Sequence, residues 1–261
     1  MHRERLIMSE IKTLVYCDLE ATGLKNSGRP RISELSLVAV NIEDVLELHT
    51  QIKMQHLECT HGIDSMLPRV MNKLTVCVYP MSVIRPEVTD ITGLDNYNLS
   101  GQSTFDKSTG ELINNFLAHL PGPLCLVAHN GNHYDFPLLK AELEKAKTTL
   151  LNTTTLCVDS YVGIQEIFKR GGFGAQHQNA ATMRSKKRLN LNNIGSPRSY
   201  SLINLHKHLL GCHPTQSHGA EADCLTLLRT TAVLGREWLD WLQDNAQLFS
   251  NCQRMWSFKD C

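Results

Sequence analysis

An apolar run near the start of the chain ends in two carboxylates and a turn. It reads T-L-V-Y-C-D-L-E-A-T-G-L from Thr13 to Leu24, with Asp18 and Glu20 two residues apart. The run predicts a buried β-strand, in which residues i and i+2 point to the same face. The two carboxylates would then stand side by side, where their charges repel and unpaired burial is costly. A hard divalent cation such as Mg²⁺ or Mn²⁺ would relieve this repulsion, because such ions choose oxygen ligands. Two solvated acids at a strand end are the plainer alternative.

Further strand and helix patterns indicate an α/β protein. The strand-like runs are short and rich in Val, Leu and Ile, and the run from Pro123 to Asn130 is typical of a strand buried on both faces. The second half is mostly helical, and Gly211 marks one helix end. Strands are expected at 34–40, 45–54, 73–78, 123–130 and 155–160, and helices at 108–120, 135–146, 201–211 and 220–234.

The composition is that of a globular protein without a membrane anchor. Of the 261 residues, 42% are hydrophobic and 20% are charged, and the formal net charge is zero, which argues against a globally basic nucleic-acid binder. No apolar stretch approaches the roughly 20 residues needed to cross a bilayer, and neither end resembles a signal peptide or a membrane tail. We therefore expect a soluble intracellular protein of the nucleus, the cytoplasm or both, with no membrane association.

Nine scattered cysteines and one histidine-rich stretch are candidates for disulfides or metal ligands. No C-x-x-C pair exists among the cysteines, which fits a reducing compartment better than a disulfide framework. The stretch H-K-H-L-L-G-C-H, from His206 to His213, suggests zinc at first sight. His206 and His208 would point about 200° apart on a helix, so solvated or packed histidines are the preferred interpretation.

One long segment has a basic character. From Gly171 to Tyr200 there is no Asp or Glu, and Gly, Asn, Gln and Ser separate the basic residues. We expect a mobile loop over 170–198 that contacts phosphate, with a plain surface insertion as the alternative. Its basic residues are Arg184, Lys186, Lys187, Arg188 and Arg198.

Two later stretches add further acids and a histidine. Asp135 in H-N-G-N-H-Y-D-F-P-L-L follows the buried strand and begins a helix, where it could also serve as a simple cap. In S-H-G-A-E-A-D, His218 precedes a helix and Asp223 lies inside it, among small and apolar neighbours where an acid needs a partner.

These three stretches have, in order, the form D-x-E, then an aspartate, then H-x₄-D. They resemble the motifs of the DEDDh exonucleases, and within that superfamily the chain is most similar to the three-prime repair exonuclease group. The I-T-G-L at Ile91, the C-V-D-S at Cys157 and the S-Y-S-L at Ser199 add to the resemblance. It implies an RNase H-like (DnaQ-like) α/β fold, a mixed five-stranded sheet flanked by helices, over residues 11–245. Residues 1–10 and 246–261 are expected to be terminal segments.

The resemblance implies hydrolysis of 3′-terminal phosphodiesters of DNA to nucleoside 5′-monophosphates, on single-stranded or frayed ends. Two Mg²⁺ ions per site, replaceable by Mn²⁺, would serve this chemistry. Asp18 would bridge them, Glu20 and Asp223 would bind the ion on the side of the attacking water, and Asp135 would bind the other. His218 would act as general base, because an ordinary histidine with a pKa of about 6.5 suits a proton acceptor at neutral pH.

The family also implies how the DNA end is held. Leu24 would act as an apolar wedge and Ile91 would pack against a base, although plain core packing is the alternative for both. Tyr134 would line the cleft, with a half-buried ring and a satisfied hydroxyl as the alternative. Family members can carry a basic residue at His133 and a lysine at Gln165, so we expect the basic loop to replace that charge. The residues expected to contact substrate, besides those of the loop, are Ala21, Leu24, Ile91, His133, Tyr134, Ser199 and Tyr200.

Family members also form homodimers by pairing edge strands, and residues 45–54 are the candidate edge here.

Two other functions share these motifs. A DEDDh ribonuclease that trims RNA 3′ ends would use the same acids, and a nucleic-acid-binding module with an idle site would retain them without turnover. The choice between DNA and RNA depends on whether the cleft accepts a 2′-hydroxyl.

Overall fold

The computed structural model describes residues 10–24, 28–58, 62, 65–170, 195–215 and 217–256, with the side chains of 55–58 excepted. In this part of the chain, one mixed six-stranded sheet has the order β3-β2-β1-β4-β5-β6. β1, β4 and β5 are parallel to one another, and β2, β3 and β6 run antiparallel to their neighbours. The strands are β1 (Thr13–Ala21), β2 (Ile32–Asn41), β3 (Asn72–Cys77), β4 (Leu124–Ala128), β5 (Leu156–Asp159) and β6 (Gln247–Leu248).

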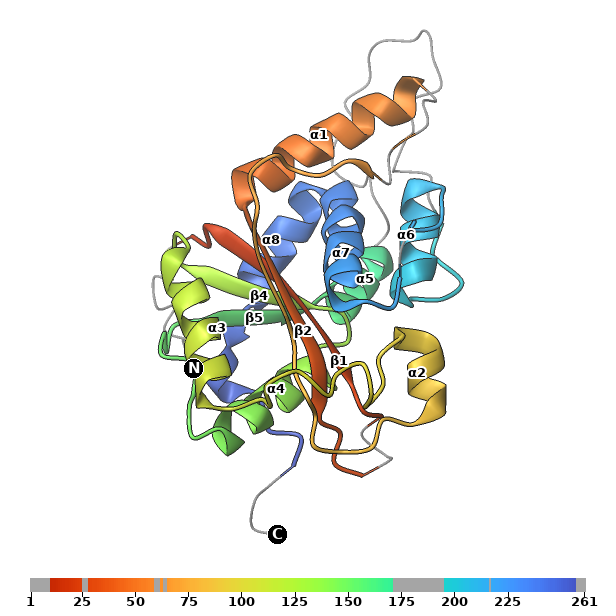
Figure 1. Cartoon of the computed structure of the whole chain (residues 1–261). Coiled ribbons are helices and arrows are strands. Elements are labelled where there is room, and N and C mark those ends of the chain that lie inside the picture. The colour runs from red at the N-terminus through yellow and green to blue at the C-terminus, as the bar shows by residue number, and fades with distance from the viewer. Residues whose placement is uncertain are drawn as a thin grey trace, which may run out of the picture.

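Helices cover both faces of this sheet (Figure 1). One face packs against α1, α5, α6, α7 and α8, and the other packs against α3 and α4. The short α2 buries no side chain and stands beside the lower end of β1 in Figure 1. The helices are α1 (Ile42–Glu58), α2 (Pro86–Thr92), α3 (Lys107–His119), α4 (Asp135–Lys145), α5 (Ser160–Lys169), α6 (Leu202–Leu210), α7 (Ala220–Leu234) and α8 (Arg236–Asn245).

Alternate side chains of β1 point to opposite faces of the sheet and so belong to two different hydrophobic cores. Leu14 and Tyr16 belong to the core under α7, whereas Val15 and Cys17 belong to the core under α3 and α4. The Tyr16 hydroxyl lies 3.0 Å from the Thr231 hydroxyl of α7, which fixes that helix over the strand. The predicted α/β fold with a mixed sheet is confirmed, with one strand more than the expected five, because the two-residue β6 extends the sheet beyond β5.

The strand predicted at residues 45–54 is wrong, because this segment is part of helix α1. Val45, Leu48 and Ile52 are buried at spacings of three and four residues, which is helical periodicity. Glu43 and Asp44 in the first turn also favour a helix start. The apolar content of the segment suggested a strand, but its spacing fits the helix. On the β2 side, the edge strand of the described sheet is therefore β3, and the two-residue β6 is the edge on the other side.

Other predicted elements lie where the sequence placed them. The strands at 34–40, 73–78, 123–130 and 155–160 correspond to β2, β3, β4 and β5, and the four predicted helices correspond to α3, α4, α6 and α7. Gly211 ends α6 in the left-handed conformation, at φ 78°. None of the described helices is both long and apolar enough to cross a bilayer.

Candidate active site

The carboxyl end of β1 carries the first two acids. Asp18 and Glu20 continue the row of Leu14 and Tyr16, so they point toward α7 rather than toward α4. β4 runs parallel to β1, and its carboxyl end leads into the loop before α4. The site therefore lies where the carboxyl ends of two parallel strands meet, which is where open α/β sheets commonly bind ligands.

The first turns of α7 bring in a third acid. Oxygen atoms of Asp18, Glu20 and Asp223 all lie within 4.8 Å of one another, and all three side chains are partly buried. Cys224, the next residue of α7, donates its thiol to the Tyr16 carbonyl over 3.4 Å. This contact holds the helix start against β1. Two acids from a strand and one from a distant helix thus share one small space.

Asp135 approaches from the opposite layer. It is the first residue of α4 and only 5% exposed. Burial raises its pKa to about 7. Its negative charge in turn raises the pKa of Asp18, so the two carboxylates are electrostatic neighbours. A helix cap alone would not place Asp135 against the acids of β1.

Crowding of negative charge dominates the electrostatics of this cluster. Burial raises the pKa of Asp18 well above its usual range, and the charges of Asp135, Asp223, Glu20 and Glu34 raise it further. Burial, followed by the charges of Asp223 and Glu34, raises the pKa of Glu20 to about 7. Such a cluster is costly without a cation among its oxygens.

The chemistry of the ligand atoms selects the kind of cation. Asp18, Glu20 and Asp223 form the only such ligand group among the described residues, and all its donors are carboxylate oxygens. Hard divalent ions prefer oxygen donors, whereas zinc sites generally include nitrogen or sulfur. In the histidine-rich stretch, His206 is buried, with Nδ1 3.0 Å from the Cys212 carbonyl. His206 is therefore a packed side chain within the fold.

His218 stands at the edge of the acidic cluster. Its side chain is exposed, and its backbone N–H donates to Asp223 Oδ2 over 3.4 Å. Its φ of 66° is left-handed, an uncommon conformation for a residue with a side chain. This turn brings the histidine back toward Asp223. Burial raises the pKa of that aspartate, and the hydrogen bond from the His218 N–H and the charge of His218 offset part of this rise.

Glu34 on β2 was not found from the sequence. It pairs with Glu20 across the β1–β2 ladder, and its Oε2 accepts the Ala220 backbone N–H over 2.9 Å. Glu34 thereby caps α7, the helix that carries Asp223. Like Asp18 and Glu20, Glu34 is an acid within an apolar strand, so the same sequence pattern could have identified it.

Asp159 was also missed. Its carboxylate accepts backbone N–H groups of Asn130 at 2.9 Å, Asn132 at 3.1 Å and Tyr161 at 2.9 Å. The first two belong to the loop between β4 and Asp135, and the third lies in the first turn of α5. A buried carboxylate, 2% exposed, therefore shapes the loop that presents Asp135.

An apolar-walled cavity of about 430 Å³ adjoins the acids. Leu24 is 73% exposed and Ile91 57% exposed, so core packing is excluded for both. Tyr134 is half-buried and donates its hydroxyl to the Gly23 carbonyl. The cavity is lined by Leu19, Glu20, Ala21, Gly23, Leu24, Arg85, Glu87, Val88, Ile91, Thr92 and Tyr134.

Known proteins of similar sequence decide the family. Three-prime repair exonuclease 1 of Bos taurus is 35% identical over 251 residues, which are 94% of this chain and 71% of that protein. Three prime repair exonuclease 2 of Mus musculus is 32% identical over 247 residues, covering 94% of this chain and 93% of that protein. The chain belongs to the three-prime repair exonuclease family. No protein-family model matches it.

Solved structures agree with the fold expected for a three-prime repair exonuclease. A structure of exonuclease I superposes with a TM-score of 0.61 at 12% identity, over 88% of this chain and 43% of that one. Escherichia coli exonuclease I in complex with a dT13 oligonucleotide gives a TM-score of 0.56, also at 12% identity, over 85% of this chain and 41% of that one. The chain thus spans less than half the length of exonuclease I, and the likeness concerns the fold.

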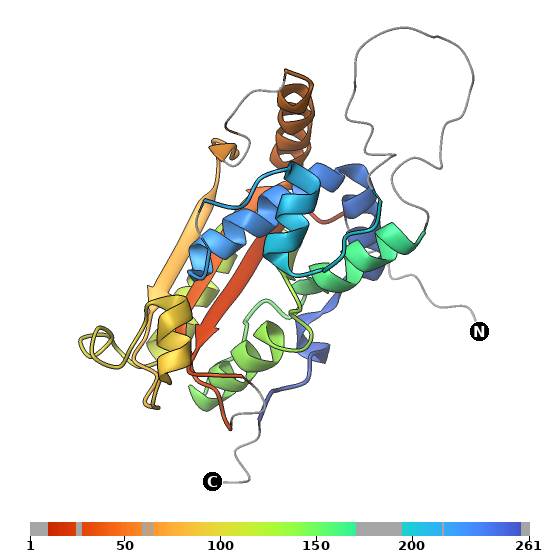
Figure 2. The ribbon, with the colours of Figure 1, turned by 90° about the vertical axis from the view of Figure 1, so that its right-hand side faces the viewer.

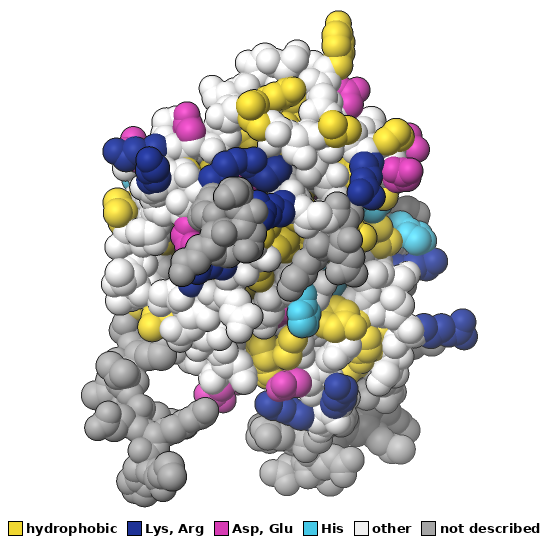
Figure 3. Space-filling model, turned by 90° about the horizontal axis from the view of Figure 1, so that it is seen from below, with side chains coloured by type: hydrophobic (Ala, Val, Ile, Leu, Met, Phe, Trp, Pro, Cys, Tyr) yellow, Lys and Arg dark blue, Asp and Glu magenta, His cyan; other side chains and the backbone are white. Residues whose placement is uncertain are grey.

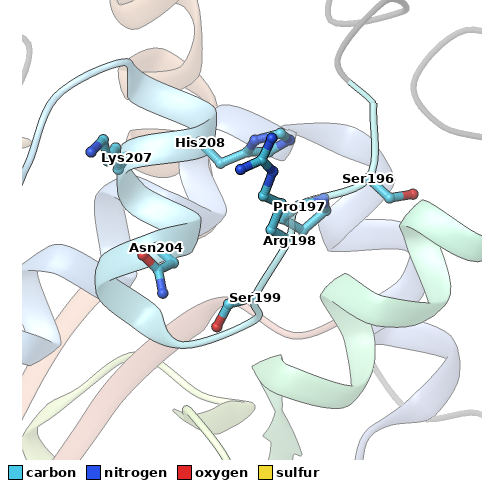
Figure 4. Close-up of a pocket in the computed structure, with 7 residues that line it drawn as sticks. All are labelled: Ser196, Pro197, Arg198, Ser199, Asn204, Lys207 and His208. Carbon is cyan, nitrogen blue, oxygen red and sulfur yellow. The ribbon is translucent and has the colours of Figure 1, made fainter.

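The remaining residues predicted to contact substrate lie in the loop before α4, in the segment before α6, or outside the described residues. His133 is exposed in the loop before α4. Ser199 is exposed and lines a second pocket beside α6 (Figure 4), whereas the ring of Tyr200 packs edge-on against Tyr161. Seen from below the view of Figure 1, hydrophobic side chains gather in the middle of the surface with Lys and Arg side chains around them (Figure 3). The predicted loop residues Arg184, Lys186, Lys187 and Arg188 lie outside the described residues.

Proposed function

We infer that this chain is a 3′→5′ DNA exonuclease, and we propose that it releases nucleoside 5′-monophosphates from single-stranded or frayed ends. The observation that carries the proposal is the meeting of Asp18, Glu20 and Asp223 within 4.8 Å, with the buried Asp135 beside them. The apolar-walled cavity beside these acids has room for a nucleotide. Family membership supports the same activity.

The four acids fit a divalent cation, and we propose two Mg²⁺ ions, replaceable by Mn²⁺, as the cofactor. When bound, such ions lower the pKa of an attacking water and stabilise the departing 3′ oxygen. Asp18, in the middle of the cluster, would share both ions. Glu20 and Asp223 would hold one of them and Asp135 the other. The two ions would neutralise these crowded negative charges, and this would favour the binding of the ions.

Other residues of the chain would bind the substrate and move a proton. His218 would accept a proton from the attacking water, since it stands at the exposed edge of the cluster beside Asp223. Leu24 and Ile91 would contact the terminal base, because both present exposed apolar side chains into one cavity. A base must leave its duplex partner to reach these side chains, which is why we propose a preference for frayed or single-stranded ends.

Timed digestion of 5′-labelled oligonucleotides tests the activity. With Mg²⁺, we expect products shortened one nucleotide at a time from the 3′ end, and no digestion in EDTA. Asp18→Asn should lower turnover at least about 100-fold, since it removes a central ligand charge. Asp240→Asn, at an exposed position on α8, is the matched control.

RNA of the same sequence distinguishes the two nuclease functions. Faster digestion of RNA than of DNA would favour the ribonuclease. Binding without any digestion in Mg²⁺ or Mn²⁺ would favour the idle module.

We propose in addition that the chain forms a homodimer through β3. This strand pairs with β2 on one side and with no other described strand on the other side. Lys73 and Thr75 of β3 donate to Glu221 of α7 at 2.8 and 3.0 Å. The free edge is therefore held firmly against the helix that carries Asp223, and a partner strand could extend the sheet there.

A further inference from the structure

Two buried thiols meet on the side of the sheet that faces α3 and α4. Cys157 lies in β5, and Cys252 follows the short turn Phe249–Asn251 beyond α8. Their sulfur atoms are 3.4 Å apart, although 95 positions separate the two residues along the chain. Cys157 is fully buried and Cys252 is 8% exposed. Neither residue takes part in the acidic site or in the cavity beside it.

The residues that follow α8, here called the C-terminal segment (246–256), run past α4 (Figure 2). Lys140 of α4 donates its ammonium group to the carbonyls of Ser250 and Cys252, each over 2.6 Å. The backbone N–H of Met255 donates to the Pro137 carbonyl over 2.9 Å. These contacts hold the backbone at Cys252 against α4.

The other end of the C-terminal segment is held on β5. Gln247 of β6 pairs with Cys157, and the backbone N–H of Phe249 donates to the Thr155 carbonyl over 2.9 Å. The Phe249 ring packs edge-on against Phe136 of α4, with ring centroids 6.3 Å apart. The fold therefore fixes both backbones that carry the thiols, so the sulfur contact is a property of the folded chain.

The surroundings make the two thiols chemically unequal. The hydrogen bond from Cys157 and the positive charge of Lys140 lower the pKa of Cys252, although burial opposes them. The same hydrogen bond, together with burial, raises the pKa of Cys157. The thiolate is the form that reacts with oxidants, so Cys252 is the attacking sulfur and Cys157 the resolving one. A cavity of about 260 Å³, lined in part by Lys140, Phe249 and Ser250, lies beside Cys252 and has room for a small oxidant.

We propose that Cys157 and Cys252 are a redox modification site that a peroxide converts into a reversible disulfide. The Cys252 thiolate attacks one oxygen of hydrogen peroxide, the O–O bond breaks, and a sulfenic acid and hydroxide result. The Cys157 sulfur then attacks the Cys252 sulfur, an S–S bond forms, and the S–O bond breaks with loss of water. In total, two thiols lose two electrons and two protons, and the peroxide becomes two waters. A transient disulfide of this kind agrees with a reducing compartment.

The disulfide would fasten the C-terminal segment to the central sheet. It would close a loop of 95 residues, which restricts the unfolded chain, so we expect the melting temperature to rise by roughly 8 °C. The fastened segment packs on α4, whose first residue is Asp135. The modification does not depend on the proposed function, because its residues and its chemistry are separate from the acids.

Peptide mapping of the unsubstituted chain tests the linkage. The reduced chain is treated with a small excess of hydrogen peroxide, denatured in N-ethylmaleimide to block remaining thiols, and digested with trypsin. Cys157 and Cys252 fall in the tryptic peptides 148–169 and 237–254, each of which contains one cysteine. We expect these peptides to be joined, with the mass of their sum less two hydrogen atoms, and to separate in dithiothreitol.

Variants connect the linkage to the rise in melting temperature, each measured before and after peroxide. Cys252→Ser should lose both the linkage and the rise. Cys125→Ala, which removes another buried thiol of the sheet, is the matched control and should keep both. If the two peptides stay separate while peroxide oxidises the more exposed Cys77, the two thiols are only packed together and the proposal is overturned. An equal rise in Cys252→Ser would show that the disulfide is not its cause, which also counts against the proposal.

Discussion

At the scale of single residues, the left-handed turn at His218 allows a clean test of its role. Asparagine tolerates this conformation better than most residues, so His218→Asn removes the imidazole with little backbone strain. We expect turnover to fall at least about 100-fold, as for loss of a general base. Binding of Mn²⁺, followed by calorimetry, should be unchanged because His218 lies outside the acidic ligand group.

The matched control for this test is His213→Asn, another exposed histidine between α6 and α7. It should retain normal turnover. If His218→Asn remained as active as the control, His218 would have no part in proton transfer.

The acids of the site were readable from the sequence for a physical reason. Asp18 and Glu20 interrupt an apolar strand and Asp223 interrupts an apolar helix, so each stands out as a charge that needs a partner. Glu34 interrupts an apolar strand in the same way, but its partner is the backbone N–H of Ala220 on a distant helix. Asp159 accepts two N–H groups of the distant loop before α4, which no local pattern reveals. The exposure of Leu24 and Ile91 was likewise a property of the folded chain.

At the scale of elements, Asp159 is a positioning residue for the loop before α4. Asp159→Asn replaces one acceptor oxygen by a donor that faces backbone N–H groups. We expect the melting temperature to fall by roughly 5 °C and turnover to fall about tenfold, as Asp135 loses its support. Thermal unfolding and digestion of labelled DNA measure the two effects.

Asp106→Ala separates stability from positioning. Asp106 caps α3 by accepting the backbone N–H groups of Ser108 and Thr109, and alanine has no side-chain acceptor, so this substitution should also lower the melting temperature. It should leave turnover intact. Equal losses of activity in both variants would mean that Asp159 acts only through general stability.

The elements also show where sequence patterns were insufficient. β4 was predictable because a continuous apolar run between turn signals suits a strand covered on both faces. The apolar content of residues 45–54 predicts a strand, whereas the spacing of three and four between their buried residues fits the helix α1. β6 has only two residues, and its pairing with β5 depends on a return of the chain from α8 that no local signal encodes.

At the scale of the whole molecule, the free edge at β3 predicts the oligomeric state. Light scattering at micromolar concentration should give twice the chain mass of 29.4 kDa. Residues 45–54 cannot supply this edge, since they belong to α1. A mass of one chain across the accessible concentrations would contradict the dimer.

The crowded acids predict how stability depends on pH and metal. The pKa values of Asp18, Glu20 and Asp135 are raised in the fold, to about 7 for the latter two. Between about pH 4 and 7 the metal-free folded chain therefore binds more protons than the unfolded chain, so its free energy of unfolding falls as pH rises. Above about pH 7 Glu20 and Asp135 are mostly ionised, so their contribution is largely lost, and Mg²⁺ should restore stability most strongly there.

Thermal unfolding at pH 5, 6, 7 and 8, in EDTA and in excess Mg²⁺, measures this effect. We expect Mg²⁺ to raise the melting temperature by roughly 5 °C at pH 8 and much less at pH 5. Asp135→Asn removes one of the repelling charges, so it should raise the melting temperature in EDTA at pH 8 and diminish the gain from Mg²⁺. Asp240→Asn, at an exposed position, should behave like the unsubstituted chain. A gain from Mg²⁺ that is equal at all four pH values would contradict the raised pKa values, because an ion that replaces protons must bind more weakly where the carboxyls hold them.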